Sequence, residues 1–81
     1  MMKIRLVLFA QFREMAGTDE LELDLVEGAT AGDLVDRLRR EQAWQLLPKT
    51  PAIAVNRAYA PLTARLSDGD EVALIPPVAG G

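Results

Sequence analysis

The 81-residue chain contains no cysteine and no histidine. Without thiols it has no disulfide, no thiolate nucleophile and no thiolate-bound metal. Without imidazole it lacks the usual general base near neutral pH and a common metal ligand. An enzyme built from this chain alone would have to work with carboxylates and amines, and we expect no metal site.

Long apolar runs are also missing, although 49% of the residues are hydrophobic. No segment approaches the roughly 20 apolar residues that a membrane helix requires, and the first residues lack the apolar segment of a signal peptide. We therefore expect one cytoplasmic globular domain with no membrane partner. The net charge of -3 argues against nucleic acid. We interpret the local cluster of Arg37, Arg39 and Arg40 as a solvated helix face.

The first third of the chain predicts a hairpin. Residues 3–10 and 20–25 both alternate between apolar and polar side chains, as strands do. The segment between them, residues 10–16, predicts a helical turn or loop that stops at Gly17. The second strand should turn its leucines inward and its three carboxylates to water, where acid–base chemistry is not expected. The outer face of the first strand carries Val7 and Phe9, so it is either covered or offered to a partner.

The middle of the chain predicts one amphipathic helix. Thr30 and Asp33 have the spacing of a capping box, and the pattern continues to about Gln42 with Leu34 and Leu38 on the buried stripe. The connection over residues 43–51 holds three large apolar side chains, which we expect to close the end of the core: Trp44, Leu46 and Leu47. A binding role for Trp44 stays open.

The last third predicts three more extended segments. Residues 52–56 form a strand, 56–59 a turn, 60–66 a weak strand, 67–70 a tight turn and 71–75 a final, almost wholly apolar strand. Asp68 and Asp70 around Gly69 could suggest a cation loop, but no glutamate follows at the required spacing. The order of elements predicts an α+β fold of the β-grasp, or ubiquitin-like, type, a mixed sheet with one crossing helix whose first and last strands lie adjacent and parallel.

The chain divides into a domain over residues 1–75 and a tail over 76–81. Pro76 and Pro77 cannot continue a sheet ladder, because each lacks an N–H group and has a fixed φ. The residues after them become smaller and end in two glycines: Val78, Ala79, Gly80 and Gly81. We expect this tail to leave the folded body and to enter another protein's active site, although an ordinary frayed terminus has the same composition.

Four segments together resemble the small, sulfur-carrying subunit of molybdopterin synthase. Residues 9–14 read Phe-Ala-Gln-Phe-Arg-Glu, like that family's Phe-Ala-x-x-Arg-Glu, and Val55-Asn56 resembles its third strand. Residues 66–72 resemble its turn into the last strand, and the end matches its Pro-Pro-x-x-Gly-Gly. One departure lies at Leu74 and Ile75, where the family has bulkier aromatic residues.

The resemblance implies a carrier whose reactive group is the carboxylate of Gly81. An E1-like activating enzyme uses ATP and magnesium to adenylate it, and a sulfur donor protein displaces AMP to leave a thiocarboxylate. The large subunit then takes this sulfur to build the dithiolene of molybdopterin, in an assembly of two small and two large subunits. The carrier itself binds no cofactor and supplies no catalytic residue.

The resemblance also assigns roles to other residues. Pro76 and Pro77 stiffen the exit of the tail, and Val78, Ala79 and Gly80 enter the partner's pocket. An apolar docking patch is predicted, with Arg13 as a charged contact at its edge; its members are Phe9, Phe12, Leu74 and Ile75. For Phe12 a place in the core competes with this role.

Other functions stay open from the residues alone. A sulfur carrier for thiazole synthesis would use the same chemistry with a different acceptor. A ubiquitin-like modifier would join Gly81 to lysines of other proteins, and a plain interaction domain would have an inert tail.

Overall fold

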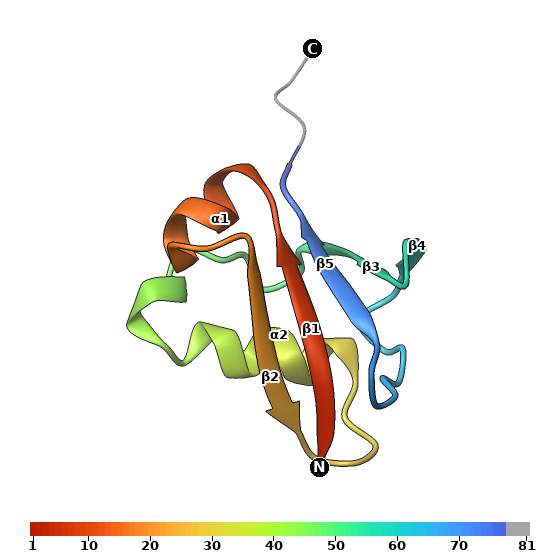
Figure 1. The fold of residues 1–81 in the computed structure, drawn as a ribbon. Coiled ribbons are helices and arrows are strands. Elements are labelled where there is room, and N and C mark those ends of the chain that lie inside the picture. The colour runs from red at the N-terminus through yellow and green to blue at the C-terminus, as the bar shows by residue number, and fades with distance from the viewer. Residues whose placement is uncertain (78–81) are drawn as a thin grey trace.

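The computed structural model describes residues 1–77, and these form one mixed sheet with a helix crossing one of its faces (Figure 1). The sheet has five strands in the order β2-β1-β5-β3-β4. The strands are β1 (Met2–Leu8), β2 (Glu20–Leu25), β3 (Ala52–Val55), β4 (Ala58–Ala60) and β5 (Glu71–Ile75). The helices are α1 (Ala10–Ala16), α2 (Ala31–Arg39) and the 3₁₀ turn η1 (Gln42–Trp44). The α+β, ubiquitin-like prediction is confirmed.

The predicted hairpin is present. β1 and β2 pair antiparallel, with Ile4 opposite Leu23 and Leu6 opposite Leu21. The helical segment between them is α1, and Gly17 caps it with φ of 75°, a left-handed conformation that glycine adopts without a Cβ clash. The side chains of the hairpin that face α2 enter the core, and those on the other side face solvent.

β5 lies in the middle of the sheet, as its apolar sequence predicts. It pairs parallel with β1, where Leu6 meets Val72, and antiparallel with β3, where Ile53 meets Leu74. Val72 and Leu74 are fully buried, whereas Ala73 and Ile75 point to the other face and keep some exposure. A strand held on both sides fixes the point at which the chain leaves the sheet.

The capping box of α2 is confirmed, but the helix is shorter than predicted. The Asp33 N–H donates to Thr30 Oγ1 at 3.2 Å, and the Thr30 N–H donates to the Asp33 carboxylate at 2.9 Å. The helix ends at Arg39 rather than Gln42, because Glu41 is extended and η1 starts a new turn.

Trp44 and Leu47 close the core as predicted, but Leu46 is 82% exposed, so its predicted burial is wrong.

The region after β3 also differs from the prediction. The turn is limited to Asn56 and Arg57, and Ala58–Ala60 pairs back on β3 as the edge strand β4. The weak strand predicted over 60–66 is wrong: Ala60 ends β4, and residues 61–66 are irregular except for one bridge between Thr30 and Arg65. Two consecutive left-handed residues allow a shorter turn than the four residues that the sequence suggested.

The core lies between α2 and one face of the sheet, and the other face is open (Figure 1). Within residues 1–77, no helix has the length and apolar character needed to cross a membrane. The last described residues, Pro76 and Pro77, follow the end of β5 at the opposite end of the sheet from the N-terminus. The division at residue 75 thus coincides with a strand end, while residues 78–81 lie outside the described part.

Replacing Thr30 by Ala should destabilise the fold through α2. The change removes a capping hydrogen bond, which costs about 1 kcal/mol and should lower the melting temperature by about 4–8 °C. Thermal unfolding followed by circular dichroism measures this. Thr63→Ala is the control, because Thr63 is exposed and outside any helix cap; equal losses for both variants would contradict the account.

Candidate functional site: the open face and the root of the tail

The open face of the sheet is divided into a charged half and an apolar half. Strand alternation places the even residues of β1 in the core and sends the odd ones to the open face. The same holds for Glu71, Ala73 and Ile75 of β5, because Arg5 pairs with Glu71 and Val7 with Ala73. Along both strands the polar side chains come first and the apolar ones lie near the tail.

The apolar half is a shallow hollow of about 430 Å³ near the end of β5. We call its apolar lining the apolar patch, defined by Val7, Phe9, Ala54, Tyr59, Ala73 and Ile75. Phe9 is 48% exposed and Tyr59 79% exposed. Exposed aromatic side chains around a hollow are typical of binding surfaces, because a partner removes large apolar areas from water.

The apolar surface continues to the root of the tail. Ile75 and Tyr59 also line a second hollow, which the prolines of the tail and of the loop before β3 complete. These prolines are Pro48, Pro51, Pro76 and Pro77. A partner that covers the apolar patch therefore lies next to the point where the chain leaves the sheet.

The predicted docking residues divide between surface and core. Phe9 and Ile75 lie on the apolar patch, and Arg13 is exposed on α1. Phe12 and Leu74 are fully buried, so Phe12 takes the core position that competed with its docking role, and the docking role predicted for Leu74 is wrong. Phe12 points from α1 into the core, and Leu74 lies on the α2 side of β5. Neither side chain has surface to offer to a partner.

Tyr59 is a member of the patch that the sequence prediction assigned to a turn. It lies on β4 opposite Ala54, which directs its ring to the open face. The residue that could have indicated this strand is Asn56, because Asn is favoured at the first position of a two-residue hairpin turn. Such a turn makes Ala58–Ala60 a strand and brings Tyr59 beside the exit of the tail.

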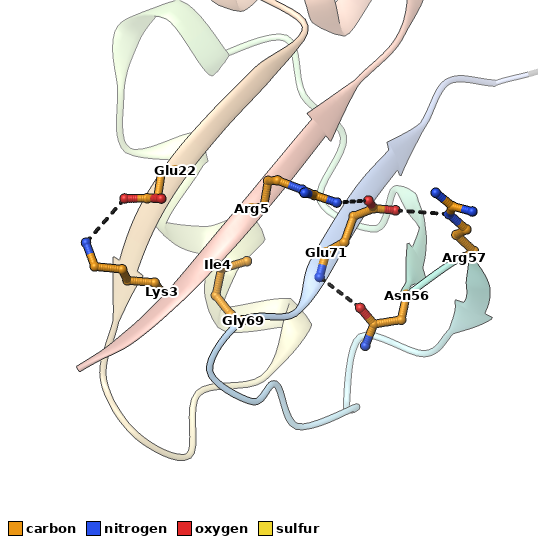
Figure 2. Close-up of a pocket in the computed structure, with 8 residues that line it drawn as sticks. All are labelled: Lys3, Ile4, Arg5, Glu22, Asn56, Arg57, Gly69 and Glu71. Atoms are coloured by element: carbon orange, nitrogen blue, oxygen red, sulfur yellow. Dashed lines mark hydrogen bonds and ion pairs between the residues drawn. The ribbon is translucent and has the colours of Figure 1, made fainter.

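The charged half of the open face is a band of ion pairs across β2, β1 and β5 (Figure 2). Lys3 Nζ lies 3.2 Å from the Glu22 carboxylate and 3.9 Å from that of Asp24. Arg5 pairs with Glu71 and, at 3.3 Å, with Glu20. The hydrogen bond to Glu22, with the charges of Glu22 and Asp24, raises the pKa of Lys3. Most of these side chains are more than half exposed, so the pairs add little to stability.

Within residues 1–77 no charged or polar residue is classed as buried, and no group of three acidic side chains could hold a metal ion. The described part of the chain offers apolar surface beside the root of the tail. The predicted reactive group, Gly81, and the predicted inserting residues Val78, Ala79 and Gly80 lie outside the described residues.

The comparison with protein families gives a match over residues 6–81 to the model described as the ThiS family. This chain belongs to the ThiS family. The match includes the final Gly-Gly and the whole sheet from the middle of β1 onward. Membership in the ThiS family thus covers both the apolar patch and the tail.

Several relatives of this ThiS-family chain are named molybdopterin synthase sulfur carrier subunit. The molybdopterin synthase sulfur carrier subunit of Mycobacterium tuberculosis is 40% identical, and the alignment covers 100% of both chains. The crystal structure of small archaeal modifier protein 1 from Haloferax volcanii is 30% identical with a TM-score of 0.85, covering 96% of this chain and all of that one. A chain from the Helicobacter pylori complex of molybdopterin-converting factor subunits 1 and 2 is 23% identical with a TM-score of 0.72, covering 99% and 100%, and shows the shared fold.

The two phenylalanines of residues 9–14 should respond differently to truncation. Phe12→Ala should lower the free energy of unfolding by about 3–5 kcal/mol, because it empties a fully buried site. Phe9→Ala should change it by less than about 1 kcal/mol, because half of the side chain is already in water. Chemical denaturation of both variants measures the difference. A larger loss for Phe9 would contradict the assignment of Phe12 to the core and Phe9 to the surface.

Proposed function

We propose that this chain is the sulfur-carrying small subunit of a molybdopterin synthase. The observation that carries the proposal is the full-length match to a relative of that name, at 40% identity. The family match also extends to residue 81, so it includes the Gly-Gly end on which such chemistry depends. The structure supports it with an apolar surface at the root of that tail.

The proposed chemistry takes place at the carboxylate of Gly81. A carboxylate resists nucleophilic attack, so an E1-like activating enzyme first joins it to the AMP unit of ATP, and pyrophosphate leaves. Hydrosulfide released by a sulfur donor protein then adds to the acyl carbon and loses its proton, and AMP leaves as the bond between the acyl carbon and the phosphate oxygen breaks. We place the binding of ATP and magnesium on the activating partner. The resulting thiocarboxylate sulfur is nucleophilic and can be transferred.

The acceptor in this proposal is a cyclic pyranopterin phosphate in the active site of the large subunit. Each transfer supplies one sulfur, so two loaded carriers are needed for each dithiolene. The proposed assembly contains two small and two large subunits. The carrier contributes the sulfur and the large subunit contributes the catalytic residues.

The described residues support the proposal through the way they hold the tail. β5 is bonded on both sides, and Pro76 and Pro77 follow it directly. Fixed φ angles at two successive residues reduce the entropy lost when a tail enters a pocket. Gly80 and Gly81 have no side chains, so in this proposal the partner's pocket closes directly on their backbone.

The apolar patch is the proposed docking surface for the large subunit. Phe9 and Tyr59 are its exposed aromatic members, and such residues frequently dominate binding energy at interfaces. Ile75 links the patch to the tail root, so docking and insertion of the tail occur on one continuous surface. Arg13 on α1 is the proposed charged contact outside the patch.

A second candidate function is that of a ubiquitin-like modifier. The specific observation in its favour is the small archaeal modifier protein from Haloferax volcanii, which matches at a TM-score of 0.85. Both functions begin with adenylation of the terminal glycine and diverge at the acceptor. Covalent conjugates of this chain with lysines of several cellular proteins would favour the modifier.

Changes at Gly81 test the proposed chemistry. Deleting Gly81, or adding one residue after it, should abolish sulfur transfer in an assay reconstituted with activating enzyme, sulfur donor, large subunit and precursor. The melting temperature should stay within about 2 °C of the wild type, because the last strand of the described sheet ends at Ile75 and changes away from the core and the helix caps rarely affect stability. Sulfur transfer by either variant would refute Gly81 as the carrier.

Changes at the apolar patch test the docking surface. Phe9→Ala and Tyr59→Ala should each weaken binding to the large subunit by about tenfold or more, because aromatic anchors at interfaces commonly contribute over 1 kcal/mol. Isothermal titration calorimetry measures the dissociation constants. Leu46→Ala is the control, since Leu46 is an exposed apolar residue outside the patch. Unchanged binding by both aromatic variants would place the interface elsewhere.

A further inference from the structure

The turn between β3 and β4 contains a residue whose backbone conformation does not suit its type. Asn56 has φ of 51° and Arg57 φ of 72°, both in the left-handed region. A two-residue hairpin turn of this kind favours Asn at its first position and Gly at its second. Asn56 meets this preference, whereas Arg57 brings a Cβ into a conformation that L-residues rarely adopt.

Asn56 has an evident structural role. Its backbone N–H donates to the Glu71 carbonyl at 2.7 Å, and its side-chain oxygen accepts from the Glu71 N–H at 3.0 Å. Its amide nitrogen also donates to the Asp70 carboxylate at 3.0 Å. These bonds fix the turn to the start of β5, so the position of Arg57 is set by the fold.

Arg57 has no comparable role in holding the fold. Its side chain is 88% exposed, and its Nε atom lies 3.8 Å from the Glu71 carboxylate. An ion pair so long and so exposed contributes little to stability. The strained conformation is therefore not explained by what Arg57 does within the chain, and such strain often occurs at functional positions.

The location of Arg57 provides a function. Its side chain lines the apolar hollow. It also lines a hollow in the charged half of the open face, which we call the charged hollow, and so it lies at the border between the two. In the charged hollow Arg5 is paired with Glu71 and Glu20. Arg57 faces Glu71 through Nε, which leaves the two Nη groups outside that pair (Figure 2). A guanidinium presented in this way can bind a carboxylate with two parallel hydrogen bonds.

We propose that Arg57 is a specificity-determining residue of the docking surface, which binds a carboxylate side chain of the large subunit at the edge of the apolar patch. This inference rests on the proposed function and adds to it the chemistry of the partner: an apolar surface with an acidic residue beside it. The Nε side of the guanidinium faces Glu71, which leaves the Nη side for the partner's carboxylate. The acidic residue fixes the register of the partner along the open face.

The experiment measures binding to the large subunit from the same organism at low and high salt. Arg57→Gln should raise the dissociation constant about 3- to 10-fold at low salt and flatten its salt dependence, as expected for a charge at the rim of an interface. Arg57→Glu should raise it further, and Arg57→Lys should restore only part of the affinity because it lacks the planar fork. Arg40→Gln is the matched control, since it makes the same change in charge at an exposed position at the end of α2.

A stability measurement separates recognition from a structural role. Arg57→Gly suits the turn, so its melting temperature should equal that of the wild type or exceed it by up to about 5 °C, while its binding should weaken as that of Arg57→Gln does. Three results would overturn the proposal: equal affinities for Arg57→Gln and Arg40→Gln, wild-type affinity for Arg57→Glu, or a fall of several degrees in the melting temperature of Arg57→Gly. A wild-type chain that does not bind the large subunit would instead contradict the proposed function itself, and this inference with it.

Discussion

The pairing of β5 on both of its edges is the constraint on which the rest of the structure depends. β5 bonds to β1 in parallel and to β3 in the antiparallel sense, and Val72 and Leu74 reach from it into the core. The last strand is therefore the central strand of the sheet, with β1 and β3 on its two sides. Whatever follows Ile75 starts from a fixed point, which is what a tail that must enter a partner's pocket requires.

The same strand alternation that builds the core also builds the proposed docking surface. Each side chain of β1 and β5 that does not enter the core faces the open side of the sheet, where polar residues gather at one end and apolar ones at the other. A chain of this size cannot cover both sheet faces with one helix. The uncovered face is consequently available for binding, and its apolar half lies beside the exit of the tail.

The sequence predicts correctly the elements that local patterns determine. It misplaces some side chains whose positions depend on how the elements pack together. The β1–β2 hairpin and the capping box of α2 follow from alternation and from the spacing of Thr30 and Asp33, which are local signals. Sequence reasoning places Leu74 on the surface and leaves Phe12 open between surface and core, because residue type alone does not say on which side of a helix or sheet a large apolar group lies. Tyr59 was missed because Arg57 conceals a turn that a glycine would have revealed. The reactive end at Gly81 is predicted from its residues and from the family resemblance, and it remains a prediction.

The most direct test of the account is the intact mass of the protein purified from its own cells, with fragmentation across the last residues. The account predicts a fraction heavier by one sulfur-for-oxygen exchange, located at Gly81. Incubation with activating enzyme, ATP and a sulfur source should increase that fraction. A chain that carries only unmodified Gly81 after this incubation would contradict its role as a sulfur carrier.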